Sequence, residues 1–240
     1  MNVMPRLSDS IGFRRFATGA GLILSGAFQL TATLVDPGTW GDSRETVSFG
    51  DNPALAQLQS ALYHWSWVLL PISVIGLLHV LRKRAVVLGH IAGVLTVLGF
   101  VSISALLMGD PVEWYFGQHY PPDQADKMFE AVYDLPGVVF AFQMPWVFLG
   151  PIGLVLLLVA LWRGGFAHWW TLVVGVVAWG SPYVTEYGPI SLIWSAGNLA
   201  VLGYYGIKVL RMGNARWAEY YPVQSAPGRT TPDSYANTTA

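Results

Sequence analysis

The sequence predicts an all-α fold, a polytopic transmembrane bundle of six helices. Of its 240 residues, 53% are hydrophobic and only 11% are charged, and the mean hydropathy is +0.45. A soluble domain of this size rarely has such a composition. Six apolar stretches are also long enough to cross roughly 30 Å of hydrocarbon as helices. We expect these spans at about 16–35, 57–81, 85–108, 137–161, 166–184 and 189–210.

The distribution of basic residues predicts the orientation of the spans. With a cytoplasmic N-terminus, only Arg44 and Lys127 of the 13 basic residues fall outside. Lys and Arg are enriched in cytoplasmic loops, so six spans place both termini in the cytoplasm of a bacterial plasma membrane. The residues predicted inside are Arg6, Arg14, Arg15, Arg82, Lys83, Arg84, Arg163, Lys208, Arg211, Arg216 and Arg229.

Prolines and acids indicate where the odd-numbered spans end. The first ends at Asp36-Pro37 and the third at Asp110-Pro111, because proline cannot continue the helical hydrogen-bond ladder. Glu186 precedes Gly188-Pro189 in the same way. The second and fourth spans share a repeated stretch, 63–72 and 142–152, in which a polar residue precedes Trp-Val by three positions. These features favour three up-down hairpins.

The chain divides into a transmembrane domain, 1–211, and a cytoplasmic tail, 212–240. The tail is rich in Ser, Thr, Pro and Gly, which predicts disorder. Within the outer loop 109–136, the stretch Pro122–Tyr133 places acids on one face and apolar residues nearer the other. This pattern predicts a short amphipathic helix at the membrane surface. Small residues in the first span predict close helix contacts, namely Gly19, Gly21, Ser25 and Gly26.

Four polar side chains lie at similar depths in four different spans. Gln29, His64 and Gln143 lie roughly 10 Å below the outer helix ends, and Asn198 lies roughly 14 Å below. Polar groups buried in a membrane need partners. The four residues either satisfy one another and fix the bundle, or form the polar floor of an outward-facing pocket. In the second interpretation, Tyr183 also contributes to ligand binding.

Carboxylates and aromatic rings lie near the same level. Asp36, Asp110, Asp134 and Glu186 each lie near an outer helix end, where acids either begin turns or concentrate cations. Five tryptophans in the outer halves of spans face lipid or line the pocket: Trp65, Trp67, Trp146, Trp179 and Trp194. An aromatic pocket suits an apolar ligand and also stabilises a carbocation through cation–π attraction.

The inner half contains three histidines at overlapping depths, His79, His90 and His168. Three histidines can ligate a metal and two can hold a haem, but histidines near helix ends also bond to backbone or water, and no carboxylate lies at that level to support them. We therefore predict no cofactor. The chain has no cysteine, which excludes disulfides and thiolate sites. It also lacks phosphate-binding glycine loops and a basic face for nucleic acid.

Several sequence features resemble those of actinobacterial six-helix integral membrane proteins of uncharacterised function. These features are Arg14-Arg15 before the first span, Asp36-Pro37 after it, Leu77-Leu78-His79-Val80-Leu81-Arg82 at the end of the second, and Leu161-Trp162-Arg163-Gly164-Gly165 between the fourth and fifth. The resemblance covers most of residues 14–211, rests on composition and spacing, and implies no function.

Three functions follow from these observations as hypotheses. The first is an outward-facing pocket for a lipid-like or small amphipathic molecule, oriented by Gln29, His64, Gln143 and Asn198 and lined by Trp67 and Trp146. The second is a membrane-embedded cyclase or isomerase of isoprenoid-type substrates, with Glu186 or Asp134 as general acid. The third is a cation- or proton-coupled transporter, although clear inverted repeats are absent. The lipid bilayer is the expected partner, and a membrane protein partner fits a structural role.

Overall fold

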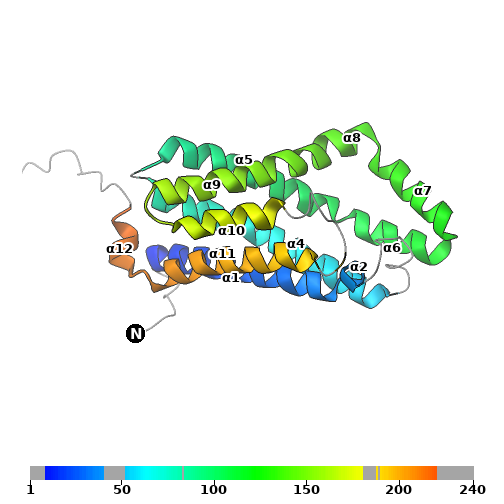
Figure 1. The fold of residues 1–240 in the computed structure, drawn as a ribbon, viewed down its shortest axis with the longest axis horizontal. Helices are drawn as coiled ribbons and strands as arrows, with labels where there is room; N and C mark the ends of the chain where they lie inside the picture. The colour runs from blue at the N-terminus through cyan, green and yellow to red at the C-terminus, as the bar shows by residue number, and fades with distance from the viewer. Residues whose placement is uncertain (1–8, 41–51, 83, 181–187, 189, 221–240) are drawn as a thin grey trace, which may run out of the picture.

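The computed structural model describes residues 9–40, 52–82, 84–180, 188 and 190–220, and these residues form helices and turns without strands (Figure 1). The all-α prediction is therefore confirmed for the described chain. The main helices are α1 (Ser10–Val35), α4 (Pro53–Leu77), α5 (Val86–Leu106), α9 (Gly150–Arg163), α10 (Trp169–Gly180) and α11 (Ser191–Arg211). The shorter ones are α2 (Pro37–Trp40), η1 (Leu78–Leu81), α6 (Gly109–His119), α7 (Pro122–Tyr133), α8 (Pro136–Val138), η2 (Val139–Gln143), η3 (Pro145–Leu149) and α12 (Asn214–Ala218).

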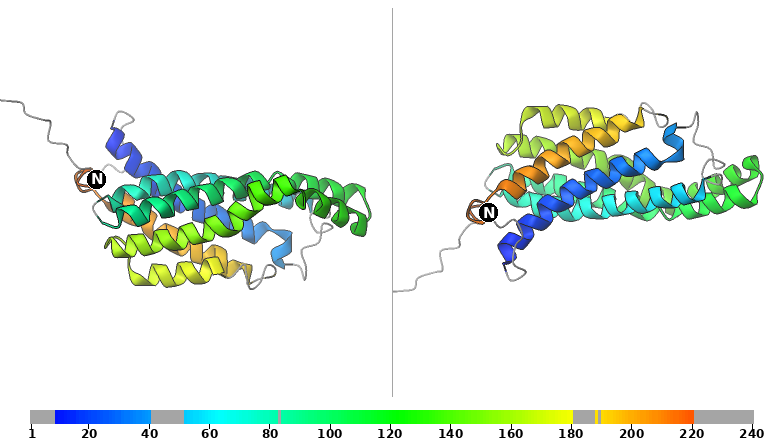
Figure 2. Two further views of the ribbon diagram at one scale, coloured as in Figure 1. Left: turned by 90° about the horizontal axis from the view of Figure 1, so that it is seen from above. Right: turned by 90° about the horizontal axis from the view of Figure 1, so that it is seen from below.

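The six main helices form a closed ring in chain order. α1 packs against α4 and α11, α5 packs against α4 and α9, and α10 packs against α9 and α11. Successive helices run in opposite directions, as Figure 2 shows. This arrangement agrees with the expected up-down hairpins. The buried core therefore lies along the axis of the ring.

Four stretches of the described chain are long and apolar enough to cross a membrane: Ser10–Val35, Pro53–Leu81, Val86–His119 and Pro136–Arg163. The helix α10 is apolar but shorter, and the rest of the predicted fifth span, 181–184, lies outside the described residues. α11 has 21 residues, but serines, glycines, tyrosines and Asn198 lower its hydropathy. The structure thus provides four of the six predicted spans by length and composition.

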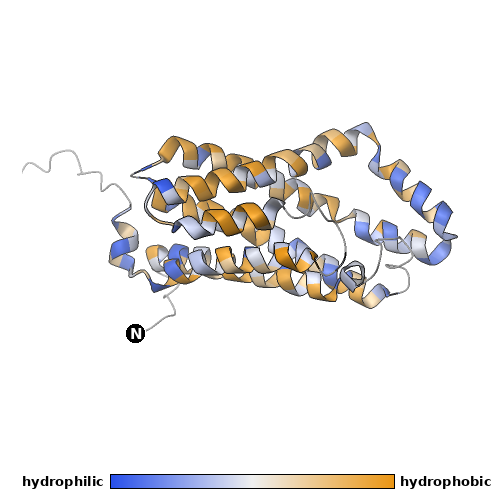
Figure 3. Cartoon of the chain, viewed as in Figure 1, coloured by the Kyte–Doolittle hydropathy of each residue, from blue (hydrophilic) through white to orange (hydrophobic). Residues whose placement is uncertain are grey.

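The outward faces of the ring carry large apolar side chains. Ile72 and Ile75 on α4, Val87 on α5 and Phe140 on η2 are 59, 61, 73 and 73% exposed. Water would disfavour so much exposed apolar surface, whereas lipid would cover it. Figure 3 shows the apolar character along the ring and the hydrophilic character of α6, α7 and α12. These observations indicate a membrane protein.

The two ends of the bundle differ. Both the beginning of α1 and the helix α12 lie at one end, and α6 and α7 extend past the other helices at the opposite end (Figure 1). The basic residues Arg84, Arg163 and Arg211 follow or end helices at the first of these ends. We call it the basic end, and we call the other the outer end after the predicted orientation.

Two predicted helix boundaries near the outer end have different outcomes. α1 ends at Val35 and Asp36 is extended, as the Asp36-Pro37 pair predicts. The third span does not end at Asp110-Pro111, because the chain turns earlier, at residues 107–108, and then begins α6. Pro111 lies in the first turn of α6, where a missing N–H has little cost. The predicted amphipathic helix Pro122–Tyr133 is confirmed as α7.

Candidate functional site in the interior of the ring

Gln29 and Asn198 form a buried pair between α1 and α11. Asn198 Nδ2 donates a hydrogen bond of 3.0 Å to Gln29 Oε1, and each residue is 1% exposed. The backbones approach closely one turn away. A Cβ atom on Gly26 would lie 2.9 Å from the Cα of Leu199, so glycine at this position lets the two amides meet.

Reciprocal serine bonds join α1 to α4 on the other side of α1. Ser25 Oγ donates to the carbonyl of Ser66 over 3.0 Å, and Ser66 Oγ donates to the carbonyl of Ser25 over 2.8 Å. The predicted role of small residues in the first span is therefore confirmed at Ser25 and Gly26. Because serine is small and glycine has no side chain, α1 can contact α4 and α11 at the same level.

Five aromatic rings from four elements form a closed circuit beside the amide pair. Tyr63 stacks on Trp67 with centroids 4.9 Å apart, and Trp67 lies 5.9 Å from Trp146. Trp146 lies 6.0 Å from Trp179, and Trp179 lies 5.8 Å from Trp194. Trp194 closes the circuit at 6.1 Å from Tyr63. We call these five residues the aromatic cage.

Phe100 of α5 packs against one side of the cage. Its ring centroid lies 5.5 Å from that of Trp146 and 5.1 Å from that of Trp179, edge to face in both cases. Phe100 is fully buried. The cage and Phe100 thus draw on α4, α5, η3, α10 and α11, which makes them the central contact of the ring.

The chain around Pro145 brings the half-buried Trp146 against Trp67 and Phe100. Proline lacks an N–H and clashes with the carbonyl four residues earlier, so the turns here widen and the backbone bonds span five residues, as from Gly150 N to Pro145 O. Next to this widened stretch α5 and α9 touch through backbone atoms. A Cβ on Gly99 would lie 2.3 Å from the nitrogen of Gly150. Only a glycine at position 99 permits this contact.

The amide pair and the cage occupy two adjacent levels. Thr33 Oγ1 lies 2.9 Å from Tyr63 Oη and also donates to the Gln29 carbonyl. α1 and α4 are antiparallel, so Tyr63 faces Thr33 and Trp67 lies one turn lower, near Gln29. Asn198 is one turn below Trp194 on α11. Trp67 therefore lies near the level of the amide pair, and Tyr63 and Trp194 lie about 6 Å above it along the bundle.

Three N–H donors at these levels have no acceptor among the described residues. They are Gln29 Nε2, Trp67 Nε1 and Trp194 Nε1, and all three nitrogens are buried. An unpaired buried donor costs about 1–3 kcal/mol of stability, and native proteins contain few of them. Their position beside the amide pair and the cage makes this part of the ring the candidate binding site.

His64 and Gln143 have other partners. His64 is exposed, Ser104 Oγ lies 3.1 Å from its Nδ1, and its ring packs edge-on against Trp65. Gln143 is half-buried and its Nε2 donates to the Tyr133 carbonyl over 2.9 Å. The structure therefore brings together two of the four predicted polar residues, not all four. One residue corresponds to about 100° around a helix, so His64 points away from the face that carries Tyr63.

The acids of the outer end make local contacts. Asp36 Oδ1 accepts from the backbone of Gly38 over 2.8 Å, and its Oδ2 accepts from Gln59 Nε2 over 3.1 Å. This bonding is that of an acid that begins a turn. Asp134 is exposed after the end of α7. Glu186 and Tyr183 lie outside the described residues.

Two acids on α6 are buried. Asp110 accepts a hydrogen bond from Ser60 Oγ of α4, and Asp110 and Glu113 are 9 and 5% exposed. Glu113 is not among the candidate residues predicted from the sequence. Glu113 is three residues after Asp110, which places both acids on one face of a helix. This spacing is the sequence feature from which Glu113 could have been predicted.

The three inner histidines do not converge. His79 is buried, its Nε2 lies 2.9 Å from the Trp217 carbonyl, and its ring packs against Trp217. His90 and His168 are exposed. Within the described ranges, no group of three His, Cys, Asp or Glu residues is placed to hold a metal ion.

No protein family, curated protein or solved structure matches the chain.

Proposed function

We propose that the chain is a six-span protein of the bacterial plasma membrane with both termini in the cytoplasm. The closed ring supports six spans, because α10 and α11 complete a wall that the four apolar stretches leave open. The common position of the first and last described helices supports a shared side for the termini (Figure 1). The basic residues at that end support a cytoplasmic assignment.

We further propose that the interior of this ring binds a lipid-like or small amphipathic molecule that carries a hydrogen-bond acceptor. The observation that carries the proposal is a set of three buried donors that have no acceptor in the described part of the chain, Gln29 Nε2, Trp67 Nε1 and Trp194 Nε1. A carbonyl, hydroxyl or ether oxygen would satisfy them. The rings of the aromatic cage would contact the apolar part of the same molecule.

Each site residue has a separate role in this proposal. Asn198 holds the Gln29 carbonyl oxygen, which fixes the direction of the Gln29 amide N–H groups. Trp67 and Trp194 supply one donor each and wide apolar surfaces. Trp146 and Trp179 close the opposite side of the cage. His64 and Gln143 support the helices outside this site.

Copurification tests the proposal with matched tryptophan substitutions. Trp67→Phe/Trp194→Phe keeps two aromatic rings but removes both N–H donors. The control, Trp65→Phe/Trp169→Phe, changes two tryptophans that are 55 and 59% exposed. Organic molecules extracted from equal amounts of each purified protein are identified and counted by mass spectrometry.

We expect a defined amphipathic molecule in the wild-type and control extracts, reduced about ten-fold in the double variant. Two lost hydrogen bonds at about 0.5–1.5 kcal/mol each correspond to that factor. Equal amounts from both double variants, or only bulk membrane lipid in every sample, would contradict the proposal.

A membrane-embedded isomerase or cyclase is a second candidate, favoured by the position of Asp110. Ser60, which donates to Asp110, is one turn above Tyr63 on α4, so a buried acid is joined to the turn of α4 that precedes the cage. An acid here would protonate a substrate double bond, the aromatic rings would stabilise the cation, and loss of a proton from a neighbouring carbon would regenerate the acid. Asp110→Asn should then abolish turnover of the copurified molecule without reducing its amount. Turnover that survives Asp110→Asn excludes this role.

A further inference from the structure

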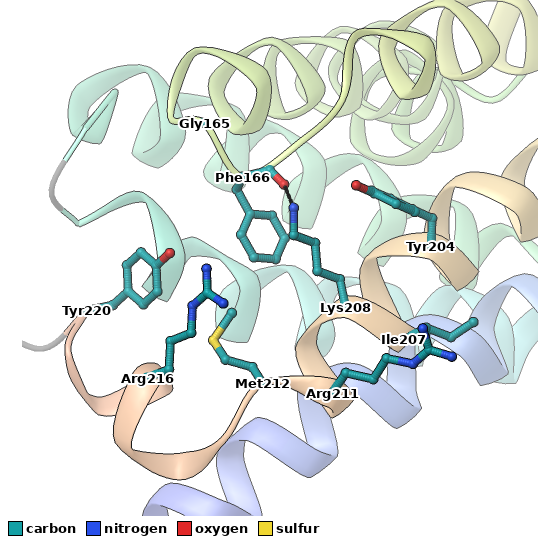
Figure 4. Close-up of a pocket in the computed structure, with 9 residues that line it drawn as sticks. All are labelled: Gly165, Phe166, Tyr204, Ile207, Lys208, Arg211, Met212, Arg216 and Tyr220. Atoms are coloured by element: carbon teal, nitrogen blue, oxygen red, sulfur yellow. Dashed lines mark hydrogen bonds between the residues drawn. The ribbon is translucent and has the colours of Figure 1, made fainter.

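A pocket of about 420 Å³ lies at the basic end. Its Lys208 follows Trp194 of the aromatic cage on α11 by roughly 21 Å along the helix. Its walls come from the α9–α10 turn, the last turns of α11, and α12 (Figure 4). Three cations and three aromatic residues define its chemistry: Lys208, Arg211, Arg216, Phe166, Tyr204 and Tyr220. None of its lining residues is acidic. The pocket is thus a cationic and aromatic cavity.

The turn after α9 builds one wall of this pocket. Gly165 has a φ of 75°, a conformation that favours glycine. The turn lets the backbone N–H groups of Phe166 and Ala167 both bond to the Leu161 carbonyl, over 2.9 and 3.0 Å. The Phe166 carbonyl is then directed toward α11. The wall is therefore fixed by backbone hydrogen bonds.

Lys208 is held in place in the same wall. Its Nζ donates to the Phe166 carbonyl and lies 4.8 Å from the centroid of the Phe166 ring and 5.7 Å from that of Tyr204. These contacts orient the ammonium group but do not neutralise it. A positive charge therefore remains at a fixed position in the pocket.

Arg211 and Arg216 add two guanidinium groups. Both side chains are exposed, and neither forms an ion pair with an acid of the described chain. Figure 4 shows Arg216 pointing toward Phe166 while Arg211 runs beside Ile207. A guanidinium group binds phosphate oxygens through two parallel hydrogen bonds. Arg216, which points into the pocket, is suited to a phosphate ester, and Arg211 adds charge at its rim.

The negative end of the α11 dipole does not oppose such a ligand. Arg15 Nη1 donates to the Leu210 carbonyl over 2.6 Å, so a cation from α1 already covers this helix end. Ile207, which is 45% exposed, lines the pocket on the outward face of α11. An anion here would therefore lie next to apolar, outward-facing surface.

We propose that this pocket binds a phosphate ester, supplied by the headgroup of an anionic membrane lipid or by a soluble phosphate compound. The site is separate from the aromatic cage, and its ligand is defined by negative charge instead of an apolar body. Lys208 gives the fixed charge, Arg216 binds the phosphate oxygens from inside the pocket, and Arg211 adds positive charge at the rim beside Ile207. The Ile207 side admits the apolar part of a lipid.

Lipid binding to the full chain in nanodiscs tests the proposal. Binding of phosphatidylglycerol and of phosphatidylcholine is measured by native mass spectrometry for wild type, Arg211→Gln/Arg216→Gln and Arg163→Gln. Arg163 is an exposed arginine at the same end that does not line the pocket. In a second arm, inorganic phosphate is titrated into each protein in phosphatidylcholine nanodiscs.

We expect wild type to prefer phosphatidylglycerol about ten-fold, the double variant to lose this preference, and Arg163→Gln to keep it. That result identifies the lipid headgroup as the source. Inorganic phosphate binding that the double variant alone loses supports the same site with a soluble source. The proposal is overturned if neither ligand binds preferentially, or if Arg163→Gln reduces binding as much as the double variant.

Discussion

Asn198 donates a hydrogen bond to Gln29 across the contact between α1 and α11, over 3.0 Å, and the two buried amides are paired at one end only. The Nε2 of Gln29 has no acceptor among the described residues. The pair therefore joins α1 to α11 through one hydrogen bond, and the proposed ligand would bond to the remaining donor.

The amide pair predicts a non-additive effect of substitution. Asn198→Leu leaves the whole Gln29 amide buried without a partner, so we expect a loss of about 1–3 kcal/mol of stability. Gln29→Leu/Asn198→Leu removes both amides and should cost less than Asn198→Leu alone. The free energies of unfolding of wild type, both single variants and the double variant, measured in mixed micelles, give the interaction energy between the two side chains. Additive losses would show that the two side chains do not interact.

The contact between Gly99 and Gly150 predicts a steric requirement. Gly99→Val would place a Cβ 2.3 Å from the Gly150 nitrogen, so α5 and α9 must separate and the packing around Trp146 must change. We expect a loss of several kcal/mol, which is the range for overpacking and backbone clashes. Thermal unfolding followed by tryptophan fluorescence measures this loss of stability. Gly137→Ala is the control, because nothing lies within 4 Å of the added Cβ, and a comparable loss there would refute the steric account.

The outward position of His64 predicts that its side chain does not contribute to ligand retention. His64→Ala should leave the amount of copurified amphipathic molecule unchanged, whereas Trp67→Phe/Trp194→Phe should reduce it. Mass spectrometry of solvent extracts compares the variants at equal protein. A loss with His64→Ala as large as that with the tryptophan variant would place the ligand on the outside of α4.

The proposed topology predicts the labelling of engineered cysteines. The chain has no native cysteine, so Asp123→Cys and Glu219→Cys, both at exposed positions, each provide a single thiol. A membrane-impermeant maleimide added to intact spheroplasts should label position 123, and should label position 219 only after lysis. Labelling of both thiols, or of 219 alone, in intact spheroplasts contradicts cytoplasmic termini.

The helices could be predicted from the sequence because their signals are local. A hydrophobic run and the Asp36-Pro37 pair predict α1. Acids on one helical face and apolar residues nearer the other predict α7. The turn before α6 could not be predicted from Asp110-Pro111, because proline is as compatible with the first turn of a helix as with its end. The choice depends on how α6 packs against α4.

The site could be predicted by depth but not by direction. The number of residues from the helix end correctly predicts that Gln29 and Asn198 lie at one depth. It does not predict on which face of the helix a side chain lies. His64 and Tyr63 are adjacent in sequence, yet only Tyr63 faces the interior. The cage itself could not be predicted, because a tryptophan facing lipid and one facing the core look alike in sequence. Trp65 is 55% exposed, whereas Trp67 is 6% exposed.

The central claim is that the buried donors of the interior bond to a molecule from outside the chain. Indole N–H resonances of ¹⁵N-tryptophan-labelled protein test it most directly, with Trp67→Phe and Trp194→Phe identifying the two signals. We expect both signals in gently purified protein to lie where hydrogen-bonded indoles resonate, and to shift upfield when the protein is stripped by extensive detergent washing and recover when the extract is returned. Signals of Trp67 and Trp194 that are identical before and after stripping would contradict the account.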